Sequence, residues 1–191
     1  MPPLSGVVDA PLLRPGSSWT YRVTDTSYKE NPQMLMLTFE KEDVYRNTGV
    51  LVFSAGPQTL YYDRDLNFVA AMQNGRVVRE AAPSYRSFDF PFYVDKEWRS
   101  VFTFQDLART ISWSPVEVFW KVKEYDVVKV PAGDFRAFRL KSDPSTNWGL
   151  EEDIWYAPEA QQVVKWSHVR SAKHYLGKGK QTGELVQYSL K

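Results

Sequence analysis

The two histidines, His168 and His174, are the side chains of this 191-residue sequence best suited to acid–base chemistry near neutral pH. His168 follows Val164 and Trp166 at alternate positions, so a strand would place all three on one face. This pattern predicts a partly buried structural histidine. His174 lies in a segment, 170–180, that is rich in lysine and glycine, which predicts a solvated hairpin loop.

The densest acidic cluster is Glu151-Glu152-Asp153. Adjacent residues of a strand point to opposite faces, so Glu151 and Asp153 could converge while Glu152 points away from them. Two carboxylates supply too few oxygens for a calcium site, and the cluster predicts an exposed edge or loop. The sequence contains no cysteine, which excludes a thiolate metal site and a cysteine nucleophile. We therefore expect no metal and no cofactor.

Motifs of the common enzyme classes are missing. The sequence has no Gly-x-Ser-x-Gly elbow, no His-Glu-x-x-His and no phosphate-cradling Gly-x-x-x-x-Gly-Lys. Lysine and arginine total 24 against 23 acidic residues, and a net charge of +1 gives no strong global attraction for nucleic acid. The sequence has no run of 18 apolar residues, so it does not predict a membrane-spanning helix. The sequence predicts a protein that is not an enzyme.

The elements that would position these side chains are strands. In the segment 127–140, Pro131 and Gly133 mark a tight turn between two runs rich in β-branched and aromatic residues. Asn74-Gly75 predicts a hairpin turn. No segment has the ten or more periodic residues of a confident helix, and the one short helical piece that the sequence predicts spans 105–109.

The predicted fold is all-β, a single curved antiparallel sheet of roughly ten to twelve strands that forms a half-barrel or a barrel, with at most short helices. Residues 17–191 would form this one domain. Residues 1–16 hold four prolines and predict an extended N-terminal arm. The segment 81–92 has aromatic residues and prolines without a clear period, which predicts a loop across the end of the sheet.

Several short motifs occur in a fixed order: Trp19 after a Pro-Gly turn, Val94–Trp98, Val130–Ala137, Trp155–Pro158, Val163–Lys165 and Glu184–Tyr188. With these motifs the chain resembles a diffuse group of bacterial cell-envelope proteins, often secreted or lipid-anchored, built on a curved antiparallel sheet. The resemblance implies a periplasmic or envelope location after removal of a targeting segment. It also implies a sheet similar to the open half-barrels of lipoprotein carriers. The chain departs from the lipid-anchored members in having no cysteine.

Two functions fit an aromatic-rich sheet. In the first, a concave face binds an apolar ligand such as a lipid or an acyl chain, with these residues as its lining: Trp19, Tyr21, Trp113, Trp120, Trp155 and Trp166. In the alternative, the same side chains fill a core, and edges or loops bind another envelope protein. An empty apolar cavity of about 300 Å³ or more would favour the first hypothesis, and a filled interior the second.

Four basic residues around the predicted loop form a second candidate site: Arg170, Lys173, Lys178 and Lys180. These side chains would approach lipid headgroups or an acidic partner protein, with Gly177 and Gly179 providing mobility.

Overall fold

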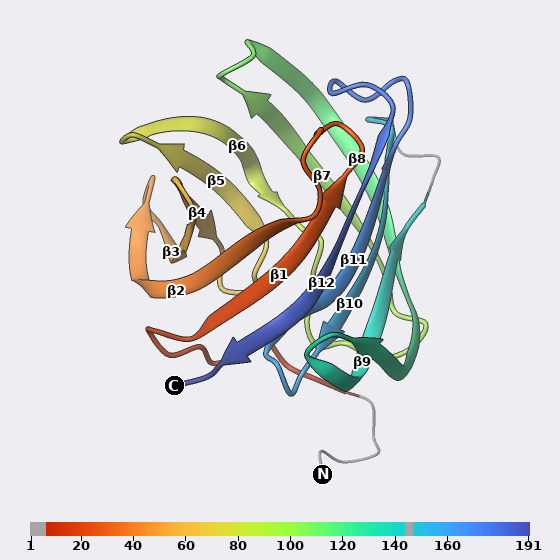
Figure 1. Ribbon diagram of the computed structural model, residues 1–191. Coiled ribbons are helices and arrows are strands. Elements are labelled where there is room, and N and C mark those ends of the chain that lie inside the picture. The colour runs from red at the N-terminus through yellow and green to blue at the C-terminus, as the bar shows by residue number, and fades with distance from the viewer. Residues whose placement is uncertain (1–6, 144–146) are drawn as a thin grey trace.

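The computed structural model describes residues 7–143 and 147–191, which form twelve antiparallel strands closed into a barrel (Figure 1). The strands are β1 (Ser18–Asp25), β2 (Gln33–Tyr45), β3 (Thr48–Ala55), β4 (Gln58–Tyr62), β5 (Phe68–Gln73), β6 (Arg76–Tyr85), β7 (Glu97–Asp106), β8 (Ile111–Val130), β9 (Gly133–Ser142), β10 (Leu150–Ala157), β11 (Gln162–Arg170) and β12 (Gly179–Ser189). Each strand pairs with its neighbour along the chain, and β12 pairs with β1 to close the ring.

The structure confirms the all-β prediction and decides between its two forms, because the sheet closes into a barrel instead of remaining a half-barrel. The short helix predicted over 105–109 is wrong. Gln105 and Asp106 end β7, and a turn follows. The Asp106 carboxylate accepts hydrogen bonds from the backbone N–H of Arg109 at 3.0 Å and from its guanidinium at 2.8 Å, which stabilises the turn in place of a helix.

Both predicted turns are confirmed. Asn74 and Gly75 join β5 to β6 with φ angles of 52° and 72°, as expected of an Asn-Gly hairpin. Gly133 is the first residue of β9 and has a φ of 135°. Residues with a side chain rarely adopt this backbone conformation, so a substitution here would strain the backbone. These local turn signals show where one strand ends and the next begins.

A loop with aromatic anchors closes one end of the barrel, as predicted. Residues 81–85 belong to β6, and the connection itself runs through 86–96. Its Phe88 and Phe92 are buried and contact the ring of Tyr156. The Asn67 side chain holds the loop by accepting the Phe88 N–H at 2.8 Å and donating to the Phe88 carbonyl at 3.1 Å. We call this end the base.

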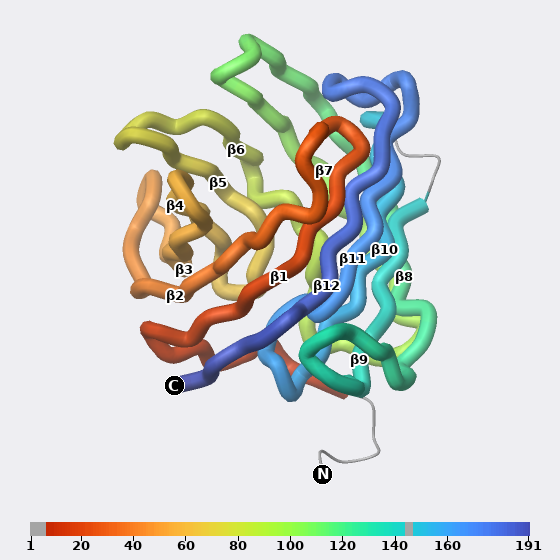
Figure 2. The backbone as a smooth tube through the Cα atoms, viewed as in Figure 1, coloured from red at the N-terminus to blue at the C-terminus, as the bar shows by residue number. Residues whose placement is uncertain are grey.

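The described residues begin and end at the base. Residues 1–6 of the predicted arm lie outside the described residues, and Val8 forms an isolated antiparallel bridge with Phe92. The C-terminus lies beside the start of β1 (Figure 2), where the Lys191 N–H donates to the Ser17 hydroxyl at 3.2 Å. The opposite end, which we call the mouth, carries the β1–β2, β7–β8 and β11–β12 connections.

Aromatic rings fill the part of the barrel between β6 and β9. Trp98 and Trp120 stack with centroids 6.1 Å apart and planes 9° apart, and Tyr85 stacks on Phe102 at 4.5 Å. Trp148 packs edge-on against Tyr85 and Phe102. Aromatic rings therefore occupy much of this half of the interior.

Candidate ligand cavity

An apolar cavity of about 250 Å³ occupies the other half of the barrel, between the β1–β4 wall and the β10–β12 wall. Among the described residues, its lining is Tyr21, Leu35, Leu37, Leu60, Tyr62, Leu66, Phe88, Ile154, Gln162, Val163, Trp166, His168 and Gln181. Leu66 and Phe88 come from the loops at the base, and Gln181 lies toward the mouth. The lining includes no lysine, arginine, aspartate or glutamate, which makes the cavity suited to apolar groups.

Two of the six predicted aromatic residues line this cavity, Tyr21 and Trp166. Their rings meet edge to face at 5.0 Å, and the Tyr21 hydroxyl donates to the Val163 carbonyl at 2.8 Å. Trp166 lies over Gly183 of β12, where an added Cβ would come within 2.1 Å of the indole. Gly183 therefore provides the space that the Trp166 ring occupies. The indole N–H donates to the Gln181 side chain at 3.2 Å, which fixes the ring at the cavity wall.

Three more of the predicted residues point inward but belong to the packed core. Trp19 is fully buried, and its indole N–H donates to the Ala160 carbonyl at 2.7 Å. Trp120 stacks on Trp98, and Trp113 is partly buried against the same core. None of these three residues lines the cavity.

The prediction for Trp155 is wrong. Its side chain lies on the outer face of β10, where the Arg139 guanidinium and the Lys165 ammonium lie 5.3 Å and 5.7 Å from its ring centroid. The neighbours Ile154 and Tyr156 are both buried and take the inward positions. Because all three residues are apolar or aromatic, the sequence alternation did not show which of them faces inward.

A buried polar cluster lies behind the cavity wall. Glu152 of β10 is 4% exposed, and the Tyr85 hydroxyl donates to its Oε2 atom. Nε2 of His168 lies 3.5 Å from the other oxygen, Oε1. The backbone N–H of Glu152 donates to the Ser142 hydroxyl at 2.7 Å. His168 thus connects this polar cluster to the apolar cavity.

Burial favours the uncharged forms of both titratable groups in the cluster. It raises the pKa of Glu152 to about 8. It also lowers the pKa of His168 to about 4, with the positive charge of Arg170 adding to the effect. The side chain of His168 is 27% exposed, and the residue lines the cavity. At neutral pH the wall offers a neutral imidazole to an occupant.

Sequence reasoning missed Glu152 because it weighed only the two residues that flank it. Those two, Glu151 and Asp153, lie on the outer face and form ion pairs with Lys141 at 3.0 Å and Arg139 at 2.7 Å. Alternation places Glu152 on the same side as Ile154 and Tyr156, but it did not show that this side is the buried one.

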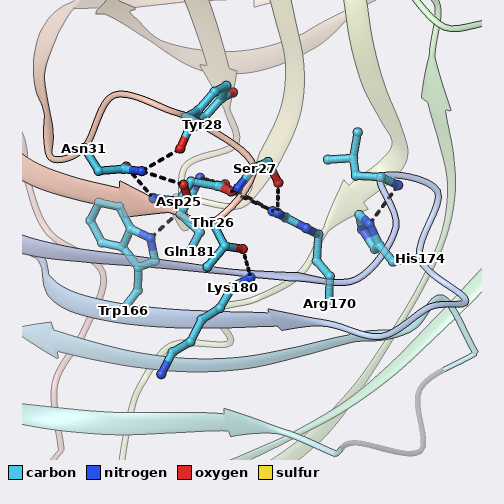
Figure 3. Close-up of polar contacts among 11 residues, drawn as sticks. Asp25, Thr26, Ser27, Tyr28, Asn31, Trp166, Arg170, His174, Lys180 and Gln181 are labelled. Carbon is cyan, nitrogen blue, oxygen red and sulfur yellow. Dashed lines mark hydrogen bonds and ion pairs between the residues drawn. The ribbon is translucent and has the colours of Figure 1, made fainter.

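An ion pair at the mouth joins β1 to β11 above the cavity (Figure 3). The Arg170 guanidinium donates to both carboxylate oxygens of Asp25, at 3.0 Å and 3.2 Å, and to the Ser27 hydroxyl at 2.6 Å. The Gln181 amide also donates to Asp25, at 3.1 Å. Leu35 and Gln181 line both the cavity and a more polar hollow of about 540 Å³ at the mouth. The cavity therefore opens toward the mouth.

The four residues of the predicted basic site differ in exposure. Lys173, Lys178 and Lys180 are exposed around the β11–β12 loop, whereas the Arg170 side chain is only 6% exposed and is bound to Asp25. Arg170 is therefore not available to an anionic surface. The prediction that His174 is solvated is also wrong, because this residue is buried in the loop.

His174 is held by its neighbours. Its ring lies 5.7 Å from that of Trp148 and 4.6 Å from that of Tyr175, and its Nδ1 atom accepts the Leu176 N–H at 3.2 Å. It does not line the cavity, so the two histidines do not act on a common space.

Within residues 7–143 and 147–191, no group of three or more His, Cys, Asp or Glu side chains could hold a metal ion. The same residues include no helix long and apolar enough to cross a membrane.

The sequence matches no known protein family model. It matches no curated protein either. Among solved structures, a protein of Bacteroides fragilis described as exported, with a YmcC-like fold, aligns with a TM-score of 0.52. The alignment covers 96% of this chain and 99% of that chain at 13% sequence identity. This chain resembles that protein in fold.

Two further structures align with lower scores. One is described as a lipoprotein of Parabacteroides distasonis, with a TM-score of 0.41 and 11% identity over 95% of this chain and 99% of that chain. The other is the hypothetical lipoprotein YmcC of Escherichia coli, with a TM-score of 0.42 and 9% identity over 92% and 86%. At the level of the fold, the Bacteroides match confirms the resemblance to bacterial envelope proteins that the sequence motifs indicated.

Proposed function

We propose that this protein is a non-catalytic component of the bacterial cell envelope that binds one apolar chain, such as the acyl chain of a lipid, inside the barrel. The observation that carries this proposal is the uncharged cavity of about 250 Å³ that opens toward the mouth. Ligand pockets usually measure about 300–1,000 Å³. At about 250 Å³ this cavity is smaller than the size that we expected to favour ligand binding, and it suits a single chain and not a whole two-chain lipid.

The expected affinity is modest. Each buried methylene contributes about 0.8 kcal/mol, so eight methylenes contribute about 6 kcal/mol before the cost of association. This corresponds to dissociation constants no tighter than about tens of micromolar. Such binding suits a protein that takes up and releases its ligand.

The envelope location is supported by the fold that this chain shares with an exported protein and by the sequence motifs. The alternative, a protein partner on the outer surface, is favoured by one feature, a hollow of about 610 Å³ over β7–β9 beside the exposed Phe119. However, Lys121 and Lys141 in that hollow already form ion pairs with Glu97 and Glu151. The interior cavity is the better supported site.

The decisive experiment is native mass spectrometry of protein purified from its own host and then incubated with an excess of host lipid extract, because a ligand held at about tens of micromolar is lost on purification. The wild type should carry a bound small molecule, and Leu60→Trp should lose it because the larger side chain fills the cavity. Leu190→Trp makes the same change on the outside, beyond the end of β12, and should keep the ligand. Melting temperatures of both variants would show that they fold.

Other outcomes would contradict the proposal. A stable protein partner without any small molecule would favour the alternative function. Turnover in an unbiased hydrolase screen that is lost on changing His168 or His174 would show that the protein is an enzyme.

A further inference from the structure

The polar group that a chain in the cavity would meet is the imidazole of His168. Its Nε2 atom makes no hydrogen bond to any described residue, and Oε1 of Glu152, at 3.5 Å, is the polar atom that faces it. A protonated Glu152 would direct its hydrogen toward Nε2, because its other oxygen accepts from Tyr85. The imidazole proton is then held on Nδ1, which leaves one N–H donor for an occupant.

From this geometry we propose that the cavity binds a neutral amphiphile, whose hydroxyl, ester or amide oxygen accepts a hydrogen bond from His168 while its alkyl chain fills the apolar space. The inference rests on the proposed function and adds the chemical class of the ligand. It separates long-chain alcohols, esters and amides from fatty-acid anions and phosphate esters.

The charges around the cavity support a neutral head. None of the described lining residues is a lysine or an arginine. The cations of the mouth hollow lie outside the cavity lining and have partners of their own. Arg170 is bonded to Asp25 and Ser27, Arg109 is bonded to Asp106, and Arg79 donates to the Gln58 side chain. An anionic head would be buried without a counter-ion, which is costly in an apolar site. The side-chain amides of Gln162 and Gln181 are polar without adding charge.

Chain length and hydrogen bonding together make the ligand class testable. Octan-1-ol, sodium octanoate and n-octane share a chain length that fits a cavity of about 250 Å³ and differ only in the head. We expect octan-1-ol to bind at least about tenfold more tightly than octanoate at pH 7.5, because octanoate must bury its charge or take up a proton. It should bind about three- to tenfold more tightly than octane, the usual gain from one hydrogen bond.

The test is isothermal titration calorimetry of the full chain with these three compounds. His168→Phe keeps an aromatic ring but removes the donor, and it should bring octan-1-ol and octane to within about twofold of each other. His174→Phe makes the same change at the buried histidine outside the cavity and should leave the preference for octan-1-ol unchanged.

The results distinguish the two proposals. Octanoate binding as tightly as octan-1-ol, or an unchanged preference in His168→Phe, would overturn the neutral-head inference while chain binding stands. Failure of all three compounds to bind the wild type would overturn both. If His168→Phe does not fold, the comparison of octan-1-ol with octanoate on the wild type still decides the inference.

Discussion

The buried ion pair between Asp25 and Arg170 should be a major contributor to the stability of the mouth. Both side chains are at most 6% exposed, and Asp25 accepts hydrogen bonds from Arg170, Ser27 and Gln181. Burial alone would raise the pKa of Asp25, but the hydrogen bonds from Arg170 and Ser27 outweigh it and lower the pKa to about 2. The change we consider is Asp25→Asn, which keeps the shape and removes the charge.

The loss of unfolding free energy on Asp25→Asn can be estimated from the pKa of Asp25. A fall from 3.8 to about 2 corresponds to about 2 kcal/mol, at about 1.36 kcal/mol per pH unit. Removing one partner of a buried pair also leaves the other charge uncompensated, a change that typically costs about 3–5 kcal/mol. We therefore expect Asp25→Asn to lower the free energy of unfolding at pH 7 by about 2–4 kcal/mol, a fall of about 5–15 °C in melting temperature for a chain of this length.

The lowered pKa of Asp25 determines how its contribution to stability changes with pH. The folded-state pKa of Asp25 is below its ordinary value, so its contribution is complete above about pH 5 and is lost as the pH falls toward 2. Urea unfolding followed by circular dichroism should therefore show a difference between wild type and Asp25→Asn that is large at pH 7 and shrinks steadily below pH 4. The matched control is Glu184→Gln at the exposed β1–β12 ion pair with Arg22, which should cost less than about 1 kcal/mol.

Two results would refute this reasoning. The first is a melting temperature of Asp25→Asn within about 2 °C of wild type, below the shift that about 1 kcal/mol would produce in a chain of this size. The second is a difference in stability that stays constant from pH 7 to pH 3, which would mean that the Asp25 charge is not responsible for it.

Three further substitutions test the fold and the cavity. Gly133→Val should lower the free energy of unfolding in urea by about 1–3 kcal/mol, because φ at this position is 135°. Gly49→Ala, at a position without a close contact, should change it by no more than about 0.5 kcal/mol. Equal effects of the two substitutions would contradict the role of backbone strain. Gly183→Ala should displace the Trp166 ring, seen as a shift in tryptophan emission and a loss of about 1–3 kcal/mol, and an unchanged spectrum would contradict the packing described. Trp120→Ala should cost about 3–5 kcal/mol and leave octan-1-ol affinity unchanged, since this ring fills the core and does not line the cavity; weaker binding would place the ligand in the other half of the barrel.

Local chemistry was enough to determine the class of fold from the sequence. The alternation of Val164, Trp166 and His168 predicted a strand, and the turn signals at Asn74-Gly75 and Pro131–Gly133 predicted how successive strands connect. These signals act between residues close in the chain, so they can be read without knowing the rest of the structure. The aromatic anchors of the base loop were visible for the same reason.

The tertiary structure alone decided where the site lies. Closure of the barrel depends on pairing β1 with β12, and the ion pair of Asp25 with Arg170 joins residues 145 positions apart, which no local pattern reveals. Alternation shows which residues share a face but not which face is inside when both carry aromatic rings, so Trp155 was misplaced. The cavity exists because rings pack tightly on one side of the barrel and leave space beside Trp166 on the other, and such packing is a property of the whole interior.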